Sequence, residues 1–101
     1  MSEERLPNIH PGEVLREEYL VPMGMTPYRL AKGLGISPTA VGEILDGKRS
    51  VTPATALRLS RFFGASAQFW LNLQAAYDLE EEERRLTDQL AAIRPYDRKV
   101  A

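Results

Sequence analysis

The stretch PYRLAKGLGISPTAVGEILDG, residues 27–47, decides the fold of this chain. Thr26-Pro27 and Ser37-Pro38 each place a capping hydroxyl before a proline at the first helical position. Gly35 can adopt the positive φ of a tight turn, and Ala31 is small where two helices would cross. The stretch therefore predicts two short helices joined by a tight turn.

The same pattern of capping residues, prolines and glycines continues outward along the chain. His10-Pro11 predicts the start of a first helix, which we expect Pro22 and Gly24 to end. Thr52-Pro53 opens a fourth helix that ends at Gly64, and Ser66 caps a fifth. Because no stretch alternates apolar and polar residues with period two, we predict an all-α, five-helix domain. A glycine turn between its second and third helices indicates a DNA-reading helix-turn-helix.

Beyond the fifth helix the sequence predicts a helical extension. Apolar residues recur on a 3-and-4 spacing that forms a short seam in need of a partner surface. Glu80 to Arg84 and Glu81 to Arg85 are favourable i,i+4 pairs that support a helix, and we expect this helix to end before Arg94-Pro95. We expect a flexible N-terminus at 1–8, the helix-turn-helix domain at 9–79, the extension at 80–94 and a loose tail at 95–101.

Composition limits the functions that the chain can have. Its 101 residues include no cysteine, which excludes a disulfide framework, cysteine zinc fingers and thiol catalysis and is typical of the cytoplasm. No apolar run approaches the length of a membrane span. The net charge is −1, but residues 26–77 carry six basic and two acidic side chains, between acidic ends. A basic middle region of this kind is compatible with DNA binding.

Three segments carry a family resemblance: HPGEVLREEYLVPMGMT (10–26), LDGKRSVTPATALRL (45–59) and FWLNLQAAYDL (69–79). They resemble the HigA (VapI-like) antitoxins, whose domain is a helix-turn-helix of the XRE, or lambda-repressor, type. The resemblance covers roughly residues 9–79. It implies a small helical homodimer that binds double-stranded operator DNA of its own operon. It also implies a RelE-like mRNA-cleaving toxin, HigB, as protein partner.

In such a motif the N-terminal half of the second motif helix reads base edges. The outward residues would be Ser37, Pro38, Thr39, Ala40, Gly42 and Glu43. Thr39 and Ala40 can touch a thymine methyl, and Glu43 can accept a hydrogen bond from cytosine. The set lacks the longer polar side chains usual in the family, so affinity should rest on phosphates. We expect these contacts from Thr26, Tyr28, Arg29, Ser37, Lys48 and Arg49.

Dimerisation is expected to involve aromatic and apolar residues of the fifth helix and the seam: Phe69, Trp70, Leu73, Tyr77, Leu86, Leu90 and Ile93. Trp70 could instead be a core residue. The acidic first helix and the run Glu80 to Glu83 are either solvated faces or contacts for a basic toxin. His10 is the only histidine, and we expect it to be a helix cap or a surface residue.

Three functions remain open at this point. The leading one is a DNA-binding antitoxin that represses its own operon. The second is a stand-alone XRE-type repressor without a toxin, and the third is a protein-interaction module that has lost DNA binding. We expect no enzyme, catalytic residue, metal or cofactor, since the chain has one histidine, no cysteine and no glycine-rich phosphate loop.

Overall fold

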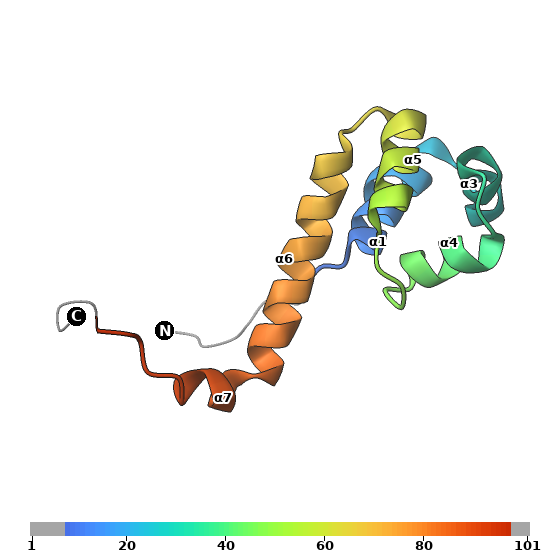
Figure 1. Ribbon diagram of the computed structural model, residues 1–101. Coiled ribbons are helices and arrows are strands. Elements are labelled where there is room, and N and C mark those ends of the chain that lie inside the picture. Colours follow the sequence, from blue (N-terminus) through green and yellow to red (C-terminus); the bar gives the residue numbers. More distant parts are fainter. Residues whose placement is uncertain (1–7, 98–101) are drawn as a thin grey trace.

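The structure is a computed structural model that describes residues 8–97. Within this range the chain is helical and contains no strand (Figure 1). The elements are α1 (Pro11–Val14), the π-helix η1 (Leu15–Leu20), α2 (Val21–Met23), α3 (Pro27–Leu34), α4 (Pro38–Leu45), α5 (Pro53–Phe63), α6 (Ala67–Arg85) and α7 (Thr87–Ala91). The predicted all-α class with a helix-turn-helix is confirmed.

The first helical segment runs through α1, η1 and α2 without interruption. In η1 the N–H of Val21 donates to the carbonyl of Arg16, five residues back. Pro22 has no N–H, and in an α-helix its ring would collide with the carbonyl four residues earlier. The wider π turn accommodates the proline, and the helix continues to Met23 and ends at Gly24, where φ is 61°. The prediction that Pro22 helps to end this helix is wrong.

The other helix boundaries follow the predicted capping pattern. The hydroxyls of Thr26, Ser37, Thr52 and Ser66 each accept a hydrogen bond from the backbone N–H three residues later. Gly35 and Gly64 end α3 and α5 with φ of 73° and 98°. A cap of this kind contributes about 1 kcal/mol. That matters here because α3 and α4 have only 8 residues each and are too short to be stable in isolation.

The core is formed where α1 and η1, α3, α4, α5 and α6 meet, and its buried members include the predicted inward residues Leu30, Ala31, Leu34, Val41, Ile44 and Leu45. Trp70 of α6 is fully buried among them. Its ring centroid lies 5.4 Å from that of Tyr19 and 5.1 Å from that of Phe69. Trp70 is therefore a core residue and has no exposed surface for a partner chain.

One close backbone approach sets the angle between α1 and α4. A Cβ atom added to Gly12 would lie 1.8 Å from the carbonyl oxygen of Ile44 and 3.0 Å from the Cα of Leu45. Both obstacles are backbone atoms, which cannot rotate away. Only glycine fits at this crossing, which holds the first helix against the end of α4.

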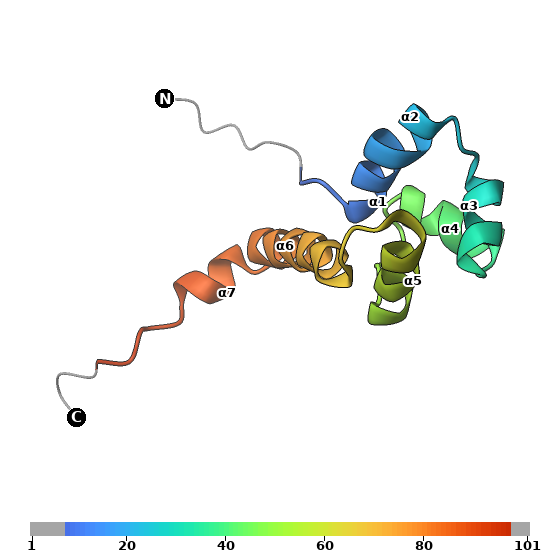
Figure 2. The ribbon, with the colours of Figure 1, turned by 90° about the horizontal axis from the view of Figure 1, so that it is seen from above.

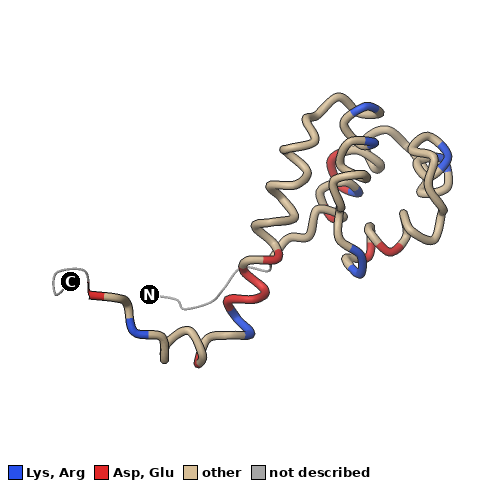
Figure 3. The backbone as a smooth tube through the Cα atoms, viewed as in Figure 1, with Lys and Arg blue, Asp and Glu red and all other residues tan. Residues whose placement is uncertain are grey.

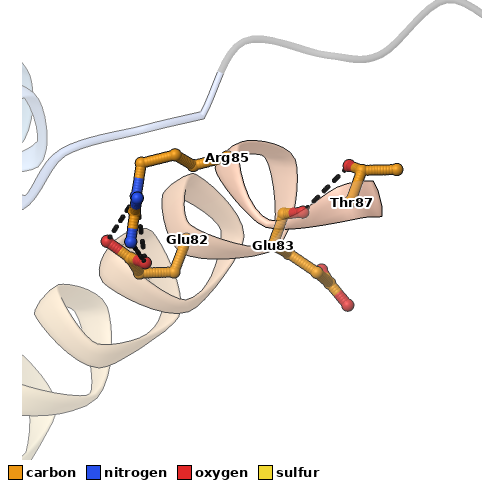
Figure 4. A network of polar contacts seen from close by, with 4 residues as sticks. All are labelled: Glu82, Glu83, Arg85 and Thr87. Atoms are coloured by element: carbon orange, nitrogen blue, oxygen red, sulfur yellow. Dashed lines mark hydrogen bonds and ion pairs between the residues drawn. The ribbon is translucent and has the colours of Figure 1, made fainter. Parts of the chain in front are cut away.

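The distal half of α6 and α7 leave the helical body and form an arm (residues 78–93; Figures 1 and 2). The predicted domain boundary at 79/80 falls inside α6, which is one continuous helix to Arg85. The extension breaks at Leu86, where ψ is 14°, and the hydroxyl of Thr87 donates to the carbonyls of Glu83 and Arg84 at 3.1 and 3.0 Å (Figure 4). The arm is thus two helices, not the single one we expected.

Ion pairs support the arm in part as predicted. Arg84 pairs with Glu80 at 2.6 Å, the expected i,i+4 contact. Arg85 pairs with Glu82 rather than with Glu81 (Figure 4). The carboxylate of Glu81 instead accepts from the side chain of Asn8 at 3.1 Å, and Asn8 also donates to the carbonyl of Tyr77.

Those two bonds tie Asn8 to α6, although the sequence predicts that residue 8 belongs to a flexible N-terminus. The rest of that segment, residues 1–7, and residues 98–101 of the expected tail lie outside the described residues. Residues 95–97 have no helical structure.

Candidate nucleic-acid interface

The two motif helices α3 and α4 present their N-terminal ends on the surface. Their inner faces are locked by Ala31, Val41 and Ile44, each at most 2% exposed. Ala31, which the sequence predicts to lie where the two helices cross, is buried. In Figure 1 no other described helix lies over the side of α4 that is turned away from the body.

The outer side of α4 is exposed mainly at its beginning. Ser37, Pro38 and Thr39 are exposed, whereas Ala40, Gly42 and Glu43 are half-buried. The side chains are short, so the backbone of α4 can approach a base-pair edge closely. Thr39 is exposed and carries a hydroxyl and a methyl group, the groups expected to bond a base edge or touch a thymine methyl.

Two predicted phosphate ligands also act as helix caps. The hydroxyl of Thr26 accepts from the N–H of Arg29 at 3.1 Å, and that of Ser37 accepts from the N–H of Ala40 at 3.0 Å. A hydroxyl that accepts in a cap keeps its own proton to donate. Capping and a phosphate contact are therefore compatible at both positions.

Glu43 and Arg49 are engaged with each other. The Nε of Arg49 donates to the carboxylate of Glu43 at 2.8 Å, and the guanidinium and carboxylate form an ion pair. Sequence reasoning treated Arg49 as a free phosphate ligand and Glu43 as a base reader and did not anticipate this pair. An exposed pair contributes only about 0.2–1 kcal/mol, so a DNA phosphate can compete for Arg49.

The remaining predicted contacts divide into two groups. Lys48 is exposed in the loop after α4, and Tyr28 is 66% exposed at the start of α3, both accessible to a ligand. Arg29 points instead toward α5, where its guanidinium lies 5.9 Å from the ring centroid of Phe62. The structure therefore groups Tyr28 and Lys48 with the open surface and directs Arg29 away from it.

Two arginines that sequence reasoning did not single out hold the motif helices in place. Arg58 of α5 donates to the carbonyl of Leu34, at the end of α3, at 2.7 Å. Arg16 of η1 donates to the carbonyl of Leu45, at the end of α4, at 3.3 Å and pairs with Asp46. Both satisfy terminal carbonyls and complement the helix dipoles. Arg58 is part of the basic middle region but serves as a cap.

His10 is a buried cap, one of the two roles expected for it. Its Nδ1 accepts from the N–H of Gly12 at 2.8 Å, and its ring meets that of Tyr77 edge-on at 4.8 Å. Burial lowers the pKa of His10 below its usual 6.5, while the Asp78 carboxylate and a backbone hydrogen bond with Arg49 act in the opposite direction. Burial thus favours the neutral form of the imidazole between α1, α6 and the loop after α4.

The residues expected at a dimer interface lie along α6 and the arm. Leu90 and Ile93 are 43% and 65% exposed, Phe69 is 38% exposed, and Leu73, Tyr77 and Leu86 are half-buried. Trp70 alone is closed to a partner. The structure also leaves Leu79 70% exposed. Exposed apolar side chains therefore lie at both ends of the arm, at Leu79 and at Leu90 and Ile93.

Residues 8–97 contain no group of three or more histidine or carboxylate side chains that could hold a metal ion. Within the same range no helix is long and apolar enough to cross a membrane. The charged side chains are distributed unevenly (Figure 3). Basic residues mark α3, α5 and the loop after α4, and acidic ones gather on the distal half of α6.

Together, the capped helix pair, the tight glycine turn and the open face of α4 define a helix-turn-helix protein. The chain matches the helix-turn-helix family over residues 15–70 and belongs to it. It is 54% identical over 83 residues to the virulence-associated protein I of Dichelobacter nodosus, which covers 82% of this chain and 77% of that protein.

Two solved structures extend the similarity to nearly the whole chain. An addiction module antidote protein of the HigA family from Coxiella burnetii is 43% identical, with a TM-score of 0.84 over 90% of this chain and 100% of that one. The Pseudomonas aeruginosa antitoxin HigA, solved with the higBA promoter, is 38% identical with a TM-score of 0.87 over 90% and 100%. The chain is a HigA-type member of the family, which comprises DNA-binding antitoxins and regulators rather than enzymes.

Proposed function

We propose that this chain is an antitoxin that binds the operator of its own operon as a homodimer and neutralises a RelE-like HigB toxin. The observation that carries the proposal is the open face of α4, set beside the capped start of α3. It occurs in a fold that superimposes on a HigA solved with its promoter. Because an operator-binding protein must reach the DNA, we place this proposed function in the cytoplasm.

The proposed mode of DNA binding relies on phosphates. Thr39 is the direct reader, and Ala40 packs on a thymine methyl. The hydroxyls of Thr26 and Ser37, the phenol of Tyr28 and the loop cations Lys48 and Arg49 contact the backbone of the duplex. We expect such an interface to bind DNA of any sequence through its phosphate contacts. Its preference for the operator would rest on the few contacts to bases.

A salt-titrated fluorescence anisotropy series on operator and scrambled duplexes tests this mode. Lys48→Ala should weaken binding to both duplexes alike and lower the salt slope by about 1–2 per dimer. Thr39→Ala should instead reduce the preference for operator by about 1–3 kcal/mol per base pair read. Arg94→Ala, which removes a cation beyond α7, is the matched control. Equal binding of both duplexes by the wild type would contradict the assignment of α4 as the reading helix.

The proposed homodimer is supported by the exposed apolar residues of the arm. Light scattering should give twice the 11.4 kDa of one chain. Leu86→Asp combined with Leu90→Asp should dissociate the dimer, because both residues lie on the projecting arm. A wild type that stays monomeric at tens of micromolar would contradict it.

Toxin neutralisation is proposed from the family and from charge. A hollow on the outer side of the first helix is lined by two apolar and three acidic residues, which suits a basic ribonuclease: Ile9, Glu13, Val14, Glu17 and Glu18. Co-expression with the small gene beside this one should restore growth that the gene alone arrests. Failure of rescue with soluble protein present would remove the antitoxin role and leave a stand-alone repressor.

A protein-interaction module without DNA binding is the second candidate. It is favoured by the ion pair that occupies Arg49 and by the absence of arginine, asparagine and glutamine from α4. A gel shift on the region upstream of the gene separates the two, since this candidate gives no shifted band.

A further inference from the structure

A groove runs between α3 and α5 on the side of the body that α6 does not cover. It has a volume of about 640 Å³ and is lined by Gly33, Leu34, Leu57, Arg58, Ser60, Arg61 and Phe62. Leu57 is 63% exposed there, although it is a large apolar residue at the centre of a helix. The lining residues of α5 lie in its later part, and Figure 1 shows that this end of the helix points away from α4. The α5 wall of the groove therefore lies away from α4, whereas its α3 wall, Gly33 and Leu34, lies just before the turn into α4.

The charged residues that line this groove, Arg58 and Arg61, are both cationic. The helices α3 and α5 carry Arg29, Lys32, Arg58 and Arg61 and no carboxylate (Figure 3). Lys32 and Arg61 are exposed, and neither forms an ion pair within residues 8–97. An apolar floor with an uncompensated cationic rim fits an acidic segment that carries leucines.

The arm of this same chain has the complementary composition. It bears the glutamate run 80–83 and Asp88, together with the exposed apolar residues Leu79, Leu90 and Ile93. Figure 4 shows the carboxylate of Glu83 pointing away from the Glu82–Arg85 pair, and Glu83 forms no ion pair with a described residue. The arm projects away from its own body, so it cannot reach its own groove (Figures 1 and 2).

We propose that the α3–α5 groove of each subunit binds the α6–α7 arm of a second copy of this chain. The proposal rests on the homodimer proposed above and specifies how that dimer is built. Two grooves do not pair with each other, because their cations repel. Reciprocal docking of two arms satisfies both cationic rims at once and closes the assembly at two copies, as a two-fold interface requires.

A charge exchange tests the polar part of this contact. Arg61→Glu alone and Glu83→Arg alone should each raise the dimer dissociation constant about tenfold, since each change occurs twice in the dimer. The double variant should regain most of the wild-type affinity, because the pair is restored with its signs reversed. Glu17→Arg, on η1, is the matched control and should leave the dimer unchanged. Loss without recovery in the double variant overturns the proposal.

Cysteine cross-linking tests the position of the arm, and the chain has no native cysteine to interfere. Leu57→Cys with Leu90→Cys should form disulfide-linked dimers under mild oxidation, with no larger ladder. Val21→Cys with Leu90→Cys should not, although Val21 is equally exposed at 63%. Cross-linking by Leu90→Cys alone would show that the arms pair with each other and would overturn the proposal. A gel shift on the same variants measures DNA binding separately. A failure of DNA binding can therefore be distinguished from a failure of arm docking.

Discussion

Replacing Glu43 with alanine should increase affinity for DNA of every sequence. In the free protein the Glu43 carboxylate holds the guanidinium of Arg49, and both side chains are substantially exposed, at 41% and 51%. Because solvent screens such a pair, breaking it costs only about 0.2–1 kcal/mol. The variant also removes a negative charge from the side of α4 that we propose faces the duplex. Arg49 then becomes available for one further phosphate contact in each subunit.

The size of the effect follows from counterion release. One extra phosphate contact per subunit makes two per dimer, and each steepens the salt slope by about 0.9, so the total change is about 1.8. Affinity for operator and for scrambled duplexes should rise by the same factor, about two- to thirtyfold, because the two pairs of a dimer together hold about 0.4–2 kcal/mol. The measurement is fluorescence anisotropy at several salt concentrations.

Glu17→Ala is the matched control for this prediction, since it removes an exposed carboxylate from η1. It should leave the salt slope as it is. If Glu43→Ala instead lowers affinity for the operator alone, the carboxylate reads a cytosine and the reasoning from the ion pair is refuted. An unchanged salt slope would equally refute the release of Arg49.

Three further predictions concern the framework that holds the interface. Gly12→Ala should lower the free energy of unfolding by at least about 1–3 kcal/mol, because the Cβ of alanine would overlap the Ile44 carbonyl oxygen. Urea denaturation measures this change. The free energy of unfolding should be constant above pH 6.5 and fall as the pH drops toward the lowered pKa of His10, and His10→Asn, which keeps a cap acceptor, should reduce this dependence. Gln74→Leu should lower the free energy of unfolding by about 1–3 kcal/mol, because the buried N–H of Val51 donates to Gln74 at 2.7 Å and would lose its acceptor. A decrease of less than about 0.3 kcal/mol would contradict this prediction.

The sequence determined most helix boundaries, because these depend on residues within one turn of each other. Hydroxyls at Thr26, Ser37, Thr52 and Ser66 cap helices wherever the following segment is helical, and the glycines after α3 and α5 end them. Apolar spacing likewise identified the inner faces of α3 and α4. These local signals were sufficient to predict the motif and the open face of its second helix.

Only the tertiary structure decided how distant side chains are used. The Arg49 guanidinium meets Glu43, Arg58 caps α3 from 24 positions away, and His10 is enclosed by Tyr77 of α6. Trp70 shows the same limit, since α6 presents it to the core rather than to a partner. The reason is physical: a cation, a ring or a carboxylate has many potential partners along a chain. Which of them it meets depends on how the helices pack, a property of the whole fold that no local pattern encodes.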